Sequence, residues 1–355
     1  MSREIELSSK PWEHVSSDEL GYTFPGLKIE TTPYENEHTG QRFNVLDIDG
    51  RNSENDPTVI SAASFNYRID PLKIRELSVF AKQSNARILY AEQPGVTMDL
   101  KDPMHTRGDF QTPKQLVLAF AGNFDPLVRE QLKAIDSVAH LKNGQEVQFF
   151  GESLAAYSIA AMIRVLAREE FEKQFVVTRM DFHEPVNAYQ NRRIKDQVKM
   201  YYQLASVEDA RRQMYLAKNK ALWPEDYVGA FEKISPFTAR IDKHVKRRQI
   251  LPVYAGGAGL RKGLHTALGN ALDANHDLRD TPMIFSRGKD STASFERDLL
   301  AGAQVVRTHG GRAETATLVS EPGDTTPIGH AALDAFAYMA SYAVARKAEI
   351  DAFKL

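Results

Sequence analysis

The stretch EVQFFGESLAAYSIAAMIR, residues 146–164, decides the predicted fold of this chain. Its first five residues are mostly apolar and β-prone, as in a buried strand. Apolar residues at helical spacing predict a helix over residues 156–164. Between the two, Gly151, Ser153 and Ala155 form the pattern Gly-x-Ser-x-Ala, whose small residues allow the strand and the helix to approach closely. The stretch therefore predicts a strand, a sharp turn with a serine at its tip, and a buried helix.

The serine of this turn is the first candidate for chemistry. A serine hydroxyl is a poor nucleophile unless it is held exposed, beside a base and at the positive end of a helix. A turn between a strand and a helix supplies that kind of position. Ser153 is therefore the predicted nucleophile.

Composition bounds the class of protein. The chain has 355 residues, of which 42% are hydrophobic and 26% are charged, and this is typical of a globular protein with one large domain and an inserted subdomain, or with two domains. The net charge of −2 argues against a nucleic-acid partner or an anionic membrane surface. The absence of cysteine excludes disulfides, thiolate metal sites and a cysteine nucleophile, and it fits a reducing compartment.

The start of the chain indicates neither export nor anchoring. Residues 1–14 are polar and contain no apolar core, so neither a secretory signal nor a membrane anchor is expected there. No stretch approaches the apolar length that spans a bilayer. We expect residues 1–25 to form an irregular leader and the protein to be cytoplasmic.

Strand and helix patterns alternate on both sides of the central stretch. The predicted strands are residues 26–34 and 41–48, which form a hairpin, and residues 57–64, 86–91, 175–181, 281–286 and 313–320. The predicted helices are residues 71–83, 113–140 with a break near 122–126, 295–303 and 331–346. Because buried strands alternate with amphipathic helices, we expect a mostly parallel central sheet flanked by helices. Residues 96–112 are predicted to form a loop.

A different pattern fills the segment between these two halves. Residues 187–280 are rich in charged helix formers and contain few strand signals, which predicts an inserted helical cap. The predicted core therefore comprises residues 26–186 and 281–355.

The order of these parts resembles the α/β-hydrolase superfamily. The resemblance lies in the strand–GESLA–helix unit, in an acid within FSRGKDS, and in a histidine between the last strand and the terminal helix, within SEPGDTTPIGHAALDAF. It implies the triad Ser153, Asp290 and His330, in the chain order that this superfamily uses. Ser153 would attack an acyl carbonyl, His330 would exchange the proton, and Asp290 would orient the imidazole.

The same resemblance implies an oxyanion hole built from backbone N–H groups. One donor would be Leu154, the residue after the nucleophile, and the other would come from the loop after strand 57–64, near Phe65.

Other residues compete for two of these roles. Asp181, at the end of strand 175–181, is the alternative acid, because Asp290 could simply cap the following helix. His309 is the alternative base. The sequence contains no cluster of His, Asp and Glu at metal-ligand spacing, so we expect neither a metal nor another cofactor.

Two functional hypotheses follow. The first is a serine hydrolase that cleaves an ester, thioester or amide of a small to medium acyl substrate, with the cap as a lid over the pocket. The second is a catalytically silent α/β-hydrolase fold that serves binding or assembly. No nucleic-acid or membrane partner is expected, and a homodimer through the cap or the edge hairpin is compatible with the sequence.

Overall fold

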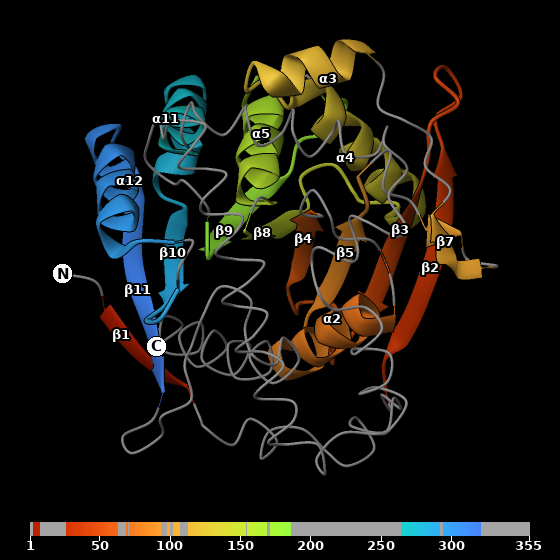
Figure 1. Ribbon diagram of the computed structural model, residues 1–355, viewed down its shortest axis with the longest axis horizontal. Helices are drawn as coiled ribbons and strands as arrows, with labels where there is room; N and C mark the ends of the chain where they lie inside the picture. The colour runs from red at the N-terminus through yellow and green to blue at the C-terminus, as the bar shows by residue number, and fades with distance from the viewer. Residues whose placement is uncertain are drawn as a thin grey trace.

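A nine-stranded sheet is the centre of the molecule (Figure 1). The computed structural model describes residues 3–7, 26–62, 69, 71–93, 98–99, 102–106, 113–153, 155–168, 171–185, 264–291 and 294–320. The strands of the sheet are β1 (Arg3–Leu7), β2 (Lys28–Glu35), β3 (Arg42–Asp49), β4 (Thr58–Ala62), β5 (Arg87–Ala91), β8 (Glu146–Glu152), β9 (Val176–His183), β10 (Pro282–Gly288) and β11 (Arg312–Ser320).

The directions of the strands agree with the predicted class. Their order across the sheet is β1-β11-β10-β9-β8-β4-β5-β3-β2. The hairpin β2/β3 and the pair β3/β5 are antiparallel, and all other neighbouring pairs are parallel. The predicted hairpin and the predicted α/β-hydrolase-like class, a mostly parallel sheet flanked by helices, are confirmed.

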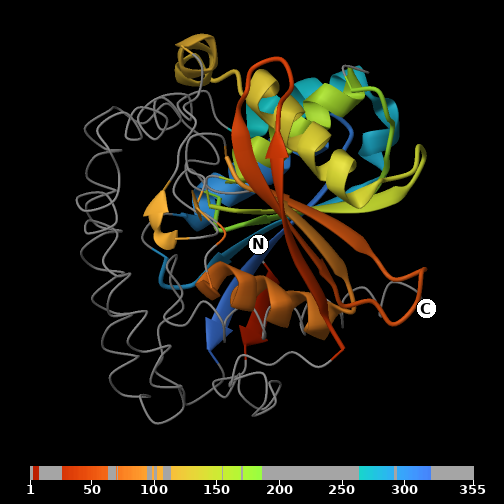
Figure 2. The same cartoon turned by 90° about the vertical axis from the view of Figure 1, so that its right-hand side faces the viewer.

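Helices cover both faces of the sheet (Figure 2). They are α2 (Pro71–Ser84), α3 (Pro113–Phe120), α4 (Asp125–Ala139), α5 (Ala155–Ala167), α11 (Leu264–Ala274), the short 3₁₀ helix η5 (His276–Arg279) and α12 (Glu296–Thr308). Helix α2 packs on one face, where it shares an apolar cluster with β3, β4 and β5. Helices α4, α5, α11 and α12 bury the larger cluster on the other face.

The central strands and helix α5 form the most deeply buried part of the molecule. All five residues of β4 are buried, as expected for a strand covered on both faces. Helix α5 lies between α4 and α11 (Figure 1), and its residues 155–166 are all buried. A helix that is mostly apolar all round belongs in the interior of a protein. The predicted strand, turn and buried helix around Ser153 are therefore present as β8 and α5.

The predicted leader is wrong for its first residues. Arg3–Leu7 forms β1, an edge strand of the sheet that pairs in parallel with β11. An edge strand is held by its ladder of backbone hydrogen bonds, so five residues without a strong apolar pattern can form one. The remainder of the predicted leader, residues 8–25, lies outside the described residues.

The predicted end of the cap is also wrong. The sequence predicts residues 264–280 in the cap, but α11 packs against α5 and α12 in the main core. Leu264, Leu268 and Leu272 are fully buried there. Burial of this leucine stripe explains why α11 belongs to the core layer. The rest of the predicted cap, residues 187–263, lies outside the described residues.

Two smaller differences concern connections. The predicted loop at residues 96–112 contains a short antiparallel pair, β6 (Met98–Asp99) and β7 (Asp102–Thr106). Helix α12 continues to Thr308, beyond the predicted end at residue 303.

Candidate active site

Ser153 occupies a strained turn between β8 and α5. Its φ angle is +57°, in the left-handed region that residues other than glycine rarely adopt. Its backbone N–H donates a hydrogen bond to the carbonyl of His183 on β9, at 2.9 Å, and its carbonyl accepts one from Ala156, at 3.3 Å. Neighbouring structure thus holds this conformation against its cost, and such strain concentrates at functional sites.

Gly151 is what permits so tight a turn. A Cβ atom at this position would lie 2.9 Å from the Cα of Ala156 and 2.9 Å from Cγ1 of Ile159, which is closer than real contacts. Because the first of these atoms belongs to the backbone of α5, a side chain at residue 151 would push the helix away from the strand. The glycine two residues before the serine is therefore a steric requirement.

Helix α5 supplies electrostatic support for the turn. It begins at Ala155, two residues after Ser153, so the partial positive charge of its N-terminus lies next to the serine. Lys73 of α2 forms an ion pair nearby, with its Nζ 3.7 Å from Oε2 of Glu152 and only 8% of its side chain exposed. The N-terminus of α5 is therefore the positive end next to the serine, and it would favour an anion that develops there.

Asp290 lies at the same edge of the sheet, in the turn after β10. The register aligns Glu152 of β8 with His183 of β9, and His183 with Ser286 of β10. Two strand spacings separate β8 from β10, about 10 Å. The side chain of Asp290 is exposed. The carboxyl ends of β8 and β10 thus bring the Ser153 turn and the Asp290 turn to one edge.

Glu184, a residue that the sequence analysis missed, fixes the turn that carries Asp290. Its side chain is fully buried, and it accepts hydrogen bonds from the backbone N–H of Gly288 and from the hydroxyl of Ser291, the latter at 2.6 Å. Its own N–H donates to the carbonyl of Ser286 at 2.7 Å, and its φ angle is +48°. A buried carboxylate that accepts two hydrogen bonds ties the end of β9 to the turn after β10. The only feature of the sequence that could have indicated this role is that Glu184 directly follows the end of β9.

Glu92 plays a similar part at the end of β5. It is fully buried, and its Oε1 accepts a hydrogen bond from the backbone N–H of Ile69 at 2.7 Å. Its Oε2 accepts from the backbone and the side chain of Asn44, at 3.0 and 2.9 Å. Ile69 belongs to the connection between β4 and α2, in which the second oxyanion donor is predicted. Glu92 therefore anchors one end of that connection.

Three predicted site residues lie outside the described residues: Leu154, Phe65 and His330. Strand β11 ends at Ser320 on the same edge of the sheet as Ser153. His330 follows ten residues later in the chain, since 330 − 320 = 10. His330, the predicted base, thus follows a strand whose carboxyl end lies at the same edge of the sheet as Ser153.

The two alternative residues have other partners. Asp181 is fully buried within β9, and both of its oxygens lie 3.0 Å from Nε of Arg179. His309 follows α12 and precedes β11, so it lies at the edge where the parallel strands begin, opposite Ser153. Its Nδ1 is 2.9 Å from a carboxylate oxygen of Asp273 on α11. His309 is therefore in the wrong place to act on Ser153.

Among the histidines that the structure describes, His183 lies beside the turn. It is fully buried, its Nδ1 is 2.8 Å from Oγ of Ser286, and its ring stacks on Phe150 with centroids 6.2 Å apart. These contacts fix the end of β9, where the backbone carbonyl of His183 accepts a hydrogen bond from the N–H of Ser153. His183 therefore supports the turn.

The residues described by the structure include no group of three or more His, Asp and Glu side chains that could hold a metal ion. None of the described helices is both long enough and apolar enough to cross a membrane.

Comparison with known proteins gives structural neighbours only. No protein-family model and no curated protein matches the chain. Among solved structures the chain is similar to a hyperthermophilic esterase from the archaeon Pyrobaculum calidifontis, with 11% identity and a TM-score of 0.49 over 97% of this chain and 88% of that one. It is also similar to a thermostable esterase from Pseudomonas putida ECU1011, with 11% identity and a TM-score of 0.45 over 96% and 90%. A thioesterase domain from the curacin biosynthetic pathway gives 12% identity and a TM-score of 0.44 over 89% and 99%. Because these scores are below 0.5, the fold class rests on the strand order and directions of the chain itself.

Proposed function

We propose that this protein is a serine hydrolase that cleaves an ester, thioester or amide bond through an acyl-enzyme intermediate. The observation that carries the proposal is the conformation of Ser153. A non-glycine residue with φ +57° stands between a central parallel strand and a buried helix, and Gly151 leaves room for the close approach. This is the geometry of a nucleophile elbow, which presents a serine hydroxyl to a substrate.

The first half of the reaction forms the acyl-enzyme. Oγ of Ser153 attacks the carbonyl carbon of the substrate while His330 takes the serine proton. The negative charge that develops on the carbonyl oxygen is met by the backbone N–H groups of Leu154 and Phe65 and by the N-terminus of α5. His330 then returns the proton to the leaving alcohol, thiol or amine as its bond to the carbonyl carbon breaks.

The second half releases the acid. A water molecule gives a proton to His330 and attacks the acyl carbon, and the proton returns to Oγ of Ser153 as the ester bond breaks. Asp290 stabilises the imidazolium in both halves. Glu184 supports this role, because its two hydrogen bonds hold the turn from which Asp290 projects.

The inserted segment is the proposed determinant of substrate size. Residues 187–263 lie in the chain between β9 and α11. In the sheet, β9 lies between β8, which leads into Ser153, and β10, which leads into the turn of Asp290. We propose that this segment closes over the acyl group of a small to medium substrate and determines its specificity.

Labelling with a fluorophosphonate tests the proposal directly. The activated serine would form an O–P bond and expel fluoride, so we expect stoichiometric label on the peptide that contains Ser153. Ser153→Ala should abolish the label, and His330→Ala should slow it by about a hundredfold or more. Ser137→Ala and His309→Ala are matched controls that should label as the wild type does, because Ser137 only donates to the carbonyl of Ala134 and His309 lies at the opposite edge.

Absence of label on folded protein would contradict the proposal and favour the catalytically silent fold. Equal labelling of the wild type and Ser153→Ala would show that a different nucleophile reacts. A series of nitrophenyl esters of increasing acyl length would then define the pocket of the wild type.

A further inference from the structure

A cavity lies in the helical layer of the molecule. It occupies about 320 Å³ between α5, α11 and the connection from α3 to α4. These elements lie side by side on one face of the sheet (Figure 1). The lining of the cavity extends along α5 from Tyr157, four residues after Ser153, to Arg168, just beyond the end of the helix at Ala167. Ser153 itself is not among the residues that line the cavity.

Its floor contains a satisfied ion pair. Nε of Arg164 lies 2.9 and 3.2 Å from the two carboxylate oxygens of Asp125, and a second nitrogen of the same guanidinium also contacts that carboxylate. The side chains are only 11% and 10% exposed. Because the pair joins one cation and one anion, it contributes no net charge to the cavity, and its burial keeps the two charges together.

Arg168 adds a positive charge that this pair does not neutralise. Its Nη1 is 3.8 Å from an oxygen of Asp125, beyond hydrogen-bond distance, and 46% of its side chain is exposed. Among the described residues that line the cavity, two guanidinium groups thus face one carboxylate, an excess of one positive charge. Arg168 carries this excess charge.

Two amides place further donors at the same cavity. Oδ1 of Asn123 accepts a hydrogen bond from the backbone N–H of Asp125 at 3.0 Å, so its NH₂ group is left as the donor. Asn270 of α11 is exposed and makes no side-chain hydrogen bond within the described residues. Tyr157, Ala161 and Ala267 supply an apolar wall beside these donors. A guanidinium with two amide donors and an apolar wall is complementary to an anionic group attached to a small hydrocarbon.

We infer that this cavity is a binding site for a small organic anion, with its carboxylate or phosphate group on Arg168, Asn123 and Asn270 and its apolar part against Tyr157. The volume is at the lower end of the range of about 300–1,000 Å³ that small-molecule sites occupy. The assignment is independent of the proposed hydrolase activity, since no catalytic residue contributes to it.

Calorimetry with the full-length protein tests this assignment. The probes are benzoate, phenyl phosphate and the neutral benzamide, which matches benzoate in shape. We expect at least one anion to bind ten times more tightly than benzamide. Tighter binding of phenyl phosphate would identify a phosphate group as the preferred ligand, and tighter binding of benzoate would identify a carboxylate.

Exposed positions supply variants that should fold. Arg168→Ala and Asn270→Asp should each weaken binding of the anion about tenfold or more, because one removes the excess cation and the other places a negative charge among the donors. Arg297→Ala removes an exposed guanidinium from α12 and should leave binding unchanged. Ser153→Ala should also retain binding, so failure of the hydrolase proposal would not affect this result. Binding that is equal for benzoate and benzamide, or unchanged in both Arg168→Ala and Asn270→Asp, would overturn the inference.

Discussion

At the scale of single residues, the conformation of Ser153 predicts an effect on the free energy of unfolding that can be measured separately from activity. Its positive φ angle costs a residue with a side chain about 1 kcal/mol relative to glycine. We expect Ser153→Gly to be more stable than Ser153→Ala by about this amount, because alanine keeps the strain and glycine relieves it. Neither variant should react with a fluorophosphonate. Urea unfolding of the two variants measures the difference.

The comparison of glycine with alanine removes the hydroxyl in both cases, so the lost hydrogen bonds of the serine cancel. Equal stability of the two variants would mean that the turn relaxes to negative φ once the serine is absent. Ser53, in an exposed turn, provides the control position, where the same pair of substitutions should not favour glycine.

At the scale of elements, Glu184 joins two strand ends that carry different parts of the site. Glu184→Ala would leave the N–H of Gly288 and the hydroxyl of Ser291 without their buried acceptor, and we expect a loss of about 2–4 kcal/mol in the free energy of unfolding. Because the turn that carries Asp290 would lose its anchor, fluorophosphonate labelling of the folded variant should also slow. Glu314→Ala, which removes an exposed carboxylate from β11, is the control and should change neither quantity. If folded Glu184→Ala is labelled at the wild-type rate, the hydrogen bonds of Glu184 are not needed for the reactivity of Ser153.

The same elements show what the sequence could predict. Strand β4 and helix α5 are buried on all sides, so their apolar runs identify them without tertiary information. Strand β1 could not be recognised, because its stability comes from pairing with β11 across more than 300 residues of chain. The sequence predicts α11 within the cap, because amphipathic helices have the same pattern whether they pack on a core or on a lid.

The candidate site divides in the same way. Ser153 could be predicted because a local pattern encodes its turn. Glu92 and Glu184 could not, because their role is to accept hydrogen bonds from residues 23 and more than 100 positions away. Sequence reasoning ordinarily places an isolated glutamate at the surface, and only the fold shows that these two are buried.

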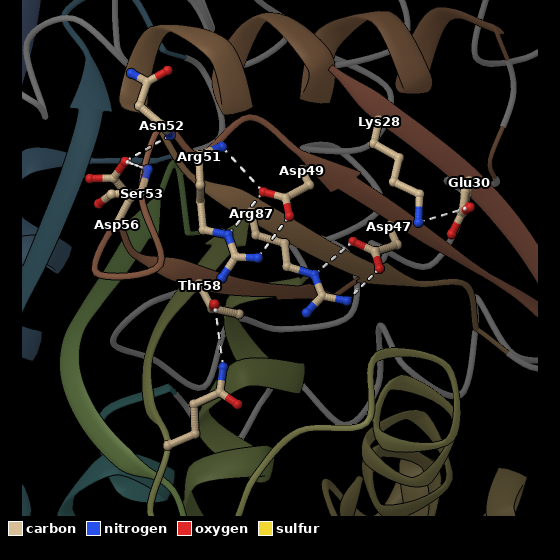
Figure 3. A network of polar contacts seen from close by, with 11 residues as sticks. Lys28, Glu30, Asp47, Asp49, Arg51, Asn52, Ser53, Asp56, Thr58 and Arg87 are labelled. Carbon is tan, nitrogen blue, oxygen red and sulfur yellow. Dashed lines mark hydrogen bonds and ion pairs between the residues drawn. The ribbon is translucent and has the colours of Figure 1, made fainter. Parts of the chain in front are cut away.

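At the scale of the whole molecule, the two edges of the sheet differ in chemistry. The edge where the parallel strands end carries Ser153 and Asp290. The opposite edge, where β4 and β5 begin, is held by ion pairs of Asp47 with Arg87 and of Asp49 with Arg51, at 2.6 and 2.7 Å (Figure 3). The turn that enters β4 is closed there by hydrogen bonds to Asp56 from the backbone of residues 52 and 53, at 2.8 and 2.9 Å.

This edge should determine part of the acid sensitivity of the protein. The hydrogen bond from the Arg51 side chain is the main cause that lowers the pKa of Asp49 below its usual value. A carboxyl whose pKa is lower in the folded state stabilises the protein above the unfolded pKa, near 3.9, and that contribution is lost as the pH falls through the folded pKa. Asp49→Asn should therefore lower the free energy of unfolding at pH 7, by less than about 1 kcal/mol because both side chains are partly exposed, and the difference from wild type should shrink below about pH 4. Urea unfolding at pH 7 and at about pH 2.5 measures this, with Glu314→Gln, an exposed carboxylate of β11, as the control. A difference that stays the same at both pH values would assign the effect of Asp49→Asn to altered hydrogen bonding in the turn, because a contribution from the charge of Asp49 disappears when that carboxyl is protonated.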